Sequence, residues 1–87
     1  MTDTLTRTIA LVRAHLAQHR PAHLIPDIGE ESSFEHDLRC DAIDMVCISL
    51  EAEDAFSLRM PPERFEDCET VEDLVGLVQS LSMENAS

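Results

Sequence analysis

The sequence predicts a single all-α domain, and three observations lead to this prediction. The chain has 87 residues, which is enough for one small hydrophobic core. Apolar residues make up 44% of it and aromatic residues only 3%, so aliphatic side chains must fill that core. Glycine is rare, and no stretch alternates β-branched with polar residues over the length of a strand, while apolar residues recur at helical spacing.

The first predicted helix spans residues 4–18. Its apolar residues follow one another at steps of four, three and four, which places them on one face of a helix. Pro21 lacks an amide hydrogen and therefore ends this helix. The apolar face consists of Leu5, Ile9, Val12 and Leu16.

Three histidines near the end of this helix, His15, His19 and His23, raise the question of a metal site. On an unbroken helix their spacing of four residues would align three imidazoles, a ligand set that zinc can use. Pro21 interrupts the helix, and neither cysteine nor carboxylate lies close in sequence to complete a site. We therefore interpret them as solvent-exposed histidines and predict no metal.

A long connection covers residues 20–40, and the second predicted helix spans residues 42–56. A connection of this length is usually functional or internally packed, and its apolar residues would anchor it to the helices. Asp41 is a good N-cap, and Asp44 falls at the third helical position, where a carboxylate is favoured. Apolar residues cover more than one side of the helix, so one side faces the core and another, with Met45 and Leu50, could meet a partner. The predicted loop anchors are Ile25, Ile28, Phe34 and Leu38.

Two further helices are predicted in the C-terminal half. Residues 62–66 form a short helix, because proline is tolerated at its first position. Thr70 caps the last helix, residues 70–81, in which Gly76 costs about 1 kcal/mol relative to alanine and therefore indicates close packing. Residues 82–87 are polar and are expected to form a flexible tail.

The charge of the chain restricts its partners. The net charge is −12, with 18 acidic residues against 6 arginines, and all the acidic residues except Asp3 lie in residues 27–87. Nucleic acid and anionic membrane surfaces are therefore excluded as partners, because phosphates require cationic contacts. A protein with a basic patch fits best, since the field of the acidic half would speed its encounter.

Two features indicate the compartment. The sequence shows neither a signal peptide nor an apolar run of the roughly 20 residues that a membrane span needs. Its three cysteines are odd in number and fit no disulfide framework, so we expect free thiols in a reducing cytoplasm.

This arrangement of helices resembles the acyl carrier protein family, whose pattern can be laid on the chain from Ser33 to Val78 without a gap. The resemblance implies a four-helix bundle with a long first loop and a short third helix, and a carrier instead of an enzyme. In that family a serine bears 4′-phosphopantetheine, on which acyl chains travel as thioesters in fatty-acid, lipid or polyketide synthesis. The resemblance rests on Phe34–Leu38, Asp41-Ala42-Ile43-Asp44, Val46, Phe56, Met60-Pro61 and Thr70-Val71.

Within the resemblance, Asp41, Ala42 and Ile43 stand at the attachment motif, with Ala42 at the position of the serine. Alanine has no hydroxyl, so the chain as written cannot form the phosphodiester. Either a serine has been substituted, which we favour, or a carrier-like fold has lost its arm and acts by docking alone, which the departures Arg39 and Cys47 favour. A third idea is that the Cys40 thiol, near the helix start, replaces the pantetheine thiol. We favour the interpretation of Cys40 as an ordinary small residue of the loop.

The resemblance also implies partners. These are a phosphopantetheinyl transferase and enzymes of acyl-chain synthesis or transfer, whose basic patches dock on the acidic second helix of a monomeric carrier. The residues expected to meet them are Asp41, Asp44, Met45, Glu51, Glu53 and Asp54.

Overall fold

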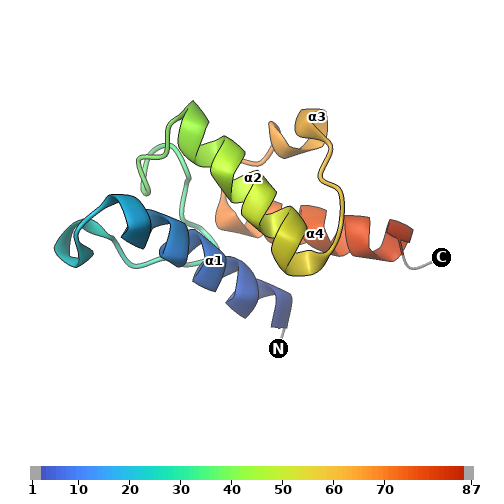
Figure 1. Cartoon of the computed structure of the whole chain (residues 1–87), viewed down its shortest axis with the longest axis horizontal. Coiled ribbons are helices and arrows are strands. Elements are labelled where there is room, and N and C mark those ends of the chain that lie inside the picture. Colours follow the sequence, from blue (N-terminus) through green and yellow to red (C-terminus); the bar gives the residue numbers. More distant parts are fainter. Residues whose placement is uncertain (1–2, 86–87) are drawn as a thin grey trace.

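The structure, a computed structural model, describes residues 3–85 and contains four α-helices with no β-strand among them. The predicted all-α fold, with a long first loop and a short third helix, is therefore confirmed (Figure 1). No helix of the described residues is long and apolar enough to cross a membrane. The elements are α1 (Asp3–His19), the 3-10 turn η1 (Ala22–Leu24), α2 (Ala42–Phe56), α3 (Pro62–Phe65) and α4 (Val71–Asn85).

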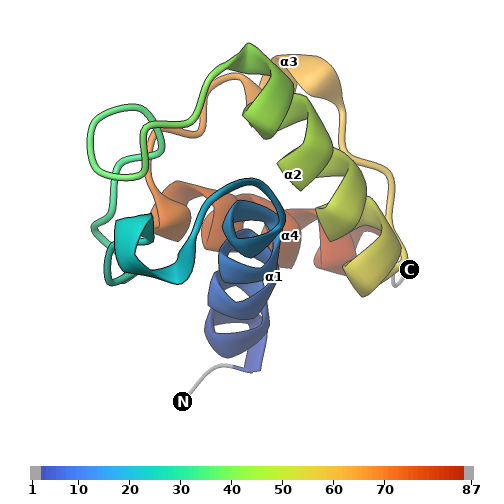
Figure 2. The same ribbon diagram turned by 60° about the vertical axis from the view of Figure 1, so that its left-hand side comes forward.

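The helices enclose one aliphatic core. Helix α1 packs against both α2 and α4, and the short α3 packs on α4 (Figures 1 and 2). Two of the three phenylalanines, Phe34 and Phe65, are buried in this core. The centre of the core is formed by Val12, Leu16, Leu38, Ile48, Ala52, Val71, Leu74 and Val78, all at most 1% exposed.

Helix α1 buries two polar side chains that the sequence gave no reason to place inside. Thr8 and His15 are buried beside Val12 and Leu16, on the face that packs against its neighbours. The interpretation of His15 as solvent-exposed is therefore wrong. Its ring lies between α1 and α2, where carboxylates 29 and 36 residues further along the chain meet it, and helical periodicity carries no information about such distant partners.

The long loop is tied to the start of α4. Ser33 forms an isolated antiparallel bridge with Thr70, and the Phe34 amide donates to the carbonyl of Glu69 (2.9 Å). The first amides of α4 have no partner within the helix, and loop carbonyls accept two of them: the Val71 amide donates to Ser32 (3.0 Å) and that of Glu72 to Glu30 (2.9 Å). Of the predicted anchors, Ile28, Phe34 and Leu38 are buried and Ile25 is partly buried.

Helix α4 differs from its prediction at Gly76 and at its end. Thr70 and Asp73 form the expected capping arrangement, in which the Asp73 amide donates to Thr70 Oγ1 (3.2 Å). Gly76 is exposed, and an added Cβ would meet nothing within 4 Å, so close packing does not explain it. The helix continues to Asn85: neither glycine nor proline occurs in residues 77–85, and Arg64 pairs with Glu84 (3.0 Å). Residues 82–85 are therefore not a tail, and residues 86–87 lie outside the described part.

Candidate functional site

The N-terminus of α2 is closed by a reciprocal capping box. The amide of Asp44 donates to Asp41 Oδ1 (2.8 Å), and the amide of Asp41 donates to Asp44 Oδ2 (3.1 Å). Both of these amides would otherwise lack a partner at the helix start. Ala42 is the first residue of α2 and is exposed, so its side chain is presented at a rigid, electropositive helix end.

The loop before this helix start is held by Arg20, at the end of α1. Its guanidinium donates to the carbonyls of Leu38 (2.6 Å) and Arg39 (2.9 Å). Arg39 itself has a φ of 55°, the left-handed conformation that glycine adopts most easily. The chain can therefore turn sharply before Asp41, and the two hydrogen bonds from Arg20 hold this turn in place.

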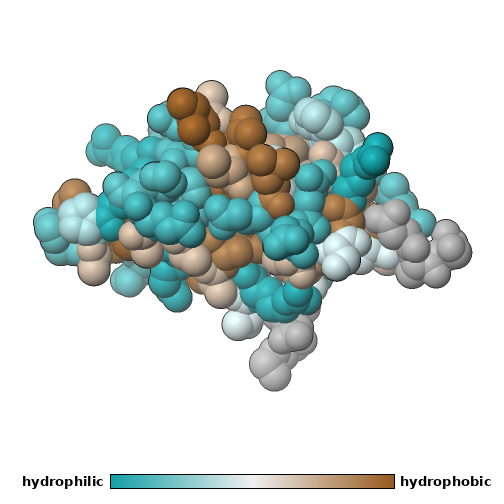
Figure 3. All heavy atoms as spheres, viewed as in Figure 1, coloured by the Kyte–Doolittle hydropathy of each residue, from teal (hydrophilic) through white to brown (hydrophobic). Residues whose placement is uncertain are grey.

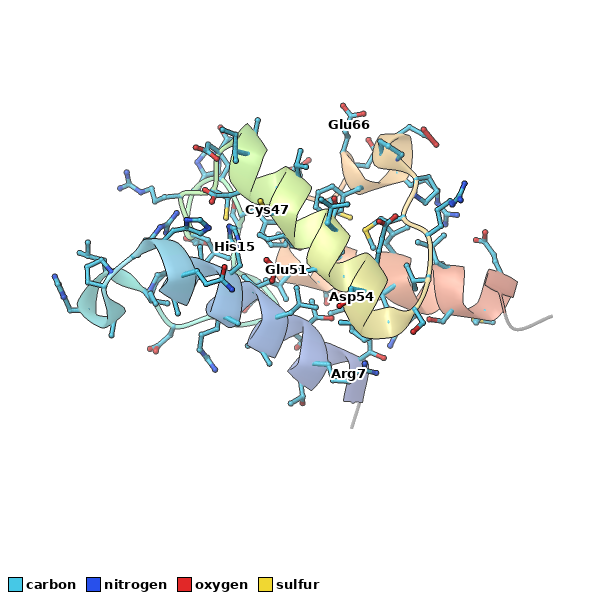
Figure 4. All side chains as sticks on the ribbon, in the orientation of Figure 1. Arg7, His15, Cys47, Glu51, Asp54 and Glu66 are labelled. Atoms are coloured by element: carbon cyan, nitrogen blue, oxygen red, sulfur yellow. The ribbon has the colours of Figure 1, made fainter. Side chains whose placement is uncertain are left out.

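Two residues of α1, and Arg20 directly after it, contact α2 along its length. Arg20 lies 3.8 Å from Asp44, near the start of α2, and His15 contacts Asp44 and Glu51. Arg7 lies at the C-terminal end of α2, where its guanidinium donates to the carbonyl of Ala55 and lies 4.4 Å from the Phe56 ring centre (Figure 4). The orientation of α2 relative to the rest of the domain is therefore set by polar contacts as well as by the core.

A groove of about 1040 Å³ opens beside Ala42, between α2 and the segment that includes α3. Glu66 and Glu69 are among the acidic residues that line it, together with Cys40 and Cys68. All three cysteines of the chain are free and partly buried. The apolar part of the wall is formed by Phe34, Met45, Val46, Leu50, Met60 and Phe65.

The thiols in this groove have raised pKa values. Burial, with the nearby charge of Asp44, raises the pKa of Cys40 to about 11, and burial with the charge of Asp73 raises that of Cys68 to about 11. Only the thiolate is a good nucleophile. The raised pKa of Cys40 argues against the idea that this thiol replaces the pantetheine thiol, because burial and the acidic neighbours disfavour its thiolate.

Of the five acidic residues expected to meet a partner, four have partners inside the domain: Asp41, which accepts the Asp44 amide, and the three described next. Asp44 and Glu51 face His15, and Glu53 Oε2 accepts the amide of Met60 (2.6 Å). Burial opposes ionisation of Asp44, but the hydrogen bonds from His15 and from the Asp41 amide hold the pKa of its carboxyl below the ordinary value. These carboxylates therefore make contacts that join different parts of the domain.

The remaining expected partner residues differ in exposure. Asp41 and Asp54 are exposed at the two ends of α2, whereas Met45 is only partly exposed and packs against the core. Leu50 is 58% exposed, Val46 57% and Ile43 73%. We call Ile43, Val46 and Leu50 the apolar stripe; apolar atoms gather along the outer edge of α2 in Figure 3. The sequence predicted a second apolar side of α2, with Met45 and Leu50, that could meet a partner; the structure leaves Leu50 exposed and packs Met45 against the core.

Together these features define a class of protein: a small acidic helical domain that presents one helix start and one apolar helix face beside a groove. Sequence comparison gives the family. A family model described as "Phosphopantetheine attachment site" matches residues 23–78, and the chain belongs to this family. Its members include the acyl carrier proteins, which are carriers and not catalysts, and 4′-phosphopantetheine is the cofactor of the family.

Individual relatives agree with this assignment. The acyl carrier protein of Thermobifida fusca is 34% identical over 53 residues, 61% of this chain and 67% of that protein. The meromycolate extension acyl carrier protein of Mycobacterium bovis is 37% identical over 59 residues, 68% of this chain; the match spans only about half (51%) of that longer relative. The crystal structure of an acyl carrier protein from Thermotoga maritima superposes with a TM-score of 0.73 at 25% identity, covering 98% of this chain and 96% of that one.

Proposed function

We propose that Ala42 occupies the position at which this family carries its 4′-phosphopantetheine. The observation that supports this most directly is the placement of Ala42: it is the exposed first residue of a capped helix, at the mouth of an apolar groove. A helix N-terminus favours a phosphate, because its free amides and its dipole attract negative charge. A serine at position 42 would therefore hold a phosphodiester where the local field stabilises it.

With a serine at this position, the domain would carry acyl intermediates as thioesters in fatty-acid, lipid or polyketide synthesis. The groove beside Ala42 suits such a cargo, since its wall includes the apolar side chains named above. Each methylene that leaves water for such a surface gains about 0.8 kcal/mol. The tail of a growing acyl chain would thus be stabilised in the groove while it travels between enzymes.

With alanine at this position, the chain can act only through contacts. We propose for this form a docking role, in which the domain binds enzymes of acyl-chain metabolism without bringing cargo. One observation favours it: the apolar stripe is uncovered, as expected of a surface that meets a partner. The net charge of −12 directs this surface towards basic proteins.

The test of the attachment position is the variant Ala42→Ser. Incubated with coenzyme A and a phosphopantetheinyl transferase of broad specificity, it should gain the mass of one phosphopantetheine, whereas the parent chain should gain none. Ala10→Ser, which adds a hydroxyl at an exposed position of α1, is the matched control and should stay unmodified. If Ala42→Ser stays unmodified while another carrier protein is modified in the same mixture, position 42 is not the attachment position.

The docking role is tested with the same reaction. The parent chain, added in excess, should inhibit modification of Ala42→Ser competitively, because docking does not need the hydroxyl. Inhibition should weaken as salt is raised from low to physiological ionic strength, since exposed charge attractions are screened. Absence of inhibition at concentrations well above the KM of Ala42→Ser would contradict docking by the alanine form.

A further inference from the structure

The carboxylate of Asp44, at the third position of α2, is held by groups from different parts of the chain. Its Oδ1 atom lies 2.9 Å from Nε2 of His15, which comes from α1. Its Oδ2 atom accepts the amide of Asp41 (3.1 Å) and lies 3.8 Å from the guanidinium of Arg20. Position 42 lies between Asp41 and Asp44, so the groups that fix this carboxylate also fix the backbone at position 42.

The contact between His15 and Asp44 joins α1 to the capping box of α2. A carboxylate has acceptors only, so Nε2 is the donor and carries a hydrogen, whether the ring is neutral or charged. The His15 side chain is 1% exposed and points from α1 towards α2 (Figure 4). Because the donor is shielded from water, solvent does not readily take its place in this hydrogen bond.

The other nitrogen of the His15 ring shows that the imidazole is costly for the fold. Among residues 3–85, buried Nδ1 finds no hydrogen-bond partner. Glu51 Oε2 lies 3.3 Å away without forming a hydrogen bond, and the Glu51 side chain is 34% exposed, so His15 does not fix it. A buried polar atom without a partner lowers stability, and a leucine would fill this place without that cost. The imidazole is therefore explained by what Nε2 holds.

We propose that His15 is a positioning residue for the attachment position. Through Nε2 it holds Asp44 in the orientation that accepts the Asp41 amide, and so sets the direction in which the side chain at position 42 leaves the domain. Arg20 assists from the preceding loop, where it donates to the carbonyls of residues 38 and 39. This inference rests on the proposed function, because it concerns the geometry of the same position, but its first test needs no serine there.

The first experiment follows hydrogen exchange of backbone amides by NMR in the chain with Ala42 unchanged. His15→Leu fills the space and removes the donor, so the Asp41 amide should exchange about fivefold faster, as for loss of one capping hydrogen bond. His15→Gln, whose side-chain amide can donate from nearly the place of Nε2, should bring the rate back to within about twofold of the parent rate. The Thr70 amide, which donates to Asp73 Oδ2 (3.2 Å) at the start of α4, is the matched control and should keep its parent rate.

A measurement on the unaltered chain decides the inference even if His15→Leu does not fold. NMR signals of the two ring nitrogens distinguish a nitrogen that carries a hydrogen from one that does not. At neutral pH, Nε2 of His15 should carry a hydrogen. If Nε2 is found without one, it does not donate to Asp44, and the inference is overturned.

The effect on the attachment position is read in the Ala42→Ser background, with coenzyme A and a phosphopantetheinyl transferase. His15→Leu should lower kcat about fivefold and leave KM within about twofold, because a buried residue misplaces the hydroxyl without touching the bound transferase. His15→Gln should restore kcat. Thr8→Val is the matched control: it removes the other buried polar side chain of α1, whose Oγ1 has no partner among the described residues, and should leave kcat and KM unchanged.

The outcomes separate the inference from the proposed function. An unchanged rate for the Asp41 amide in His15→Leu, or no rescue by His15→Gln, overturns the inference even if Ala42→Ser is modified. Faster exchange of the Asp41 and Thr70 amides alike also overturns it, because the whole domain is then loosened. If Ala42→Ser gains no phosphopantetheine, the proposed function fails, and exchange of the Asp41 amide still decides whether His15 fixes the backbone at position 42.

Discussion

The capping box of α2 gives the most direct test of how the helix start at position 42 is built. The substitution is Asp41→Ala, which removes the acceptor of the 2.8 Å hydrogen bond from the Asp44 amide. Loss of an N-cap side chain costs about 1 kcal/mol, within a range of roughly 0.5–2 kcal/mol. For a domain of this size, a loss of about 1 kcal/mol lowers Tm by roughly 4–8 °C.

The assay is thermal unfolding followed by far-ultraviolet circular dichroism, with urea unfolding for the free energy. Asp41→Asn should retain most of the stability, because asparagine is as good a cap as aspartate. Asp54→Ala, an exposed substitution on the same helix, should change the free energy of unfolding by no more than about 0.5 kcal/mol. If Asp41→Ala were no more destabilising than Asp54→Ala, the box would not be what holds this helix start.

Three further results are expected. Gly76→Ala should stabilise the domain by about 1 kcal/mol in urea unfolding, because the position is exposed, helical and free of neighbours; a loss of stability would refute this. The pKa values of Asp44 and Asp73 are held low in the folded state, so both stabilise it above their unfolded pKa, and this contribution is lost as pH falls below about 4. Urea midpoints at a series of pH values should show this fall, and Asp73→Asn should make it shallower. With pKa values of about 11, the thiols of Cys40 and Cys68 should react with a disulfide reagent at pH 8 on the order of 100-fold more slowly in the native protein than in urea; equal rates would contradict their burial.

Much of the fold could be predicted because its signals are local. The bounds of α2, residues 42–56, follow from Asp41 as cap, Asp44 three residues on, and an apolar pattern that continues to Phe56. The short α3 follows in the same way from proline at its first position. In each case the residues that decide the structure lie within a few positions of one another.

The predictions that were wrong, for Gly76 and for residues 82–85, concern residues whose surroundings are set by other parts of the chain. Gly76 is predicted to be close-packed because a glycine inside a helix usually has such a reason, yet it lies on the exposed side of α4 with nothing near an added Cβ to pack against. Residues 82–85 were expected to form a tail because they are polar, but they continue α4, and Glu84 meets Arg64 from α3. Polarity tells whether a side chain tolerates water and not whether the backbone stays helical.

The sequence by itself determined the helical class, the acidic surface, the cap at Asp41 and the absence of a hydroxyl at position 42, since each of these is a property of residue types and short spacings. The tertiary structure alone decided that His15 lies inside the domain between Asp44 and Glu51, and that the exposed side of α2 is its apolar stripe. The physical reason is that the charge state and exposure of a side chain depend on what packs against it. For α2 that neighbour is α1, which approaches only when the chain has folded.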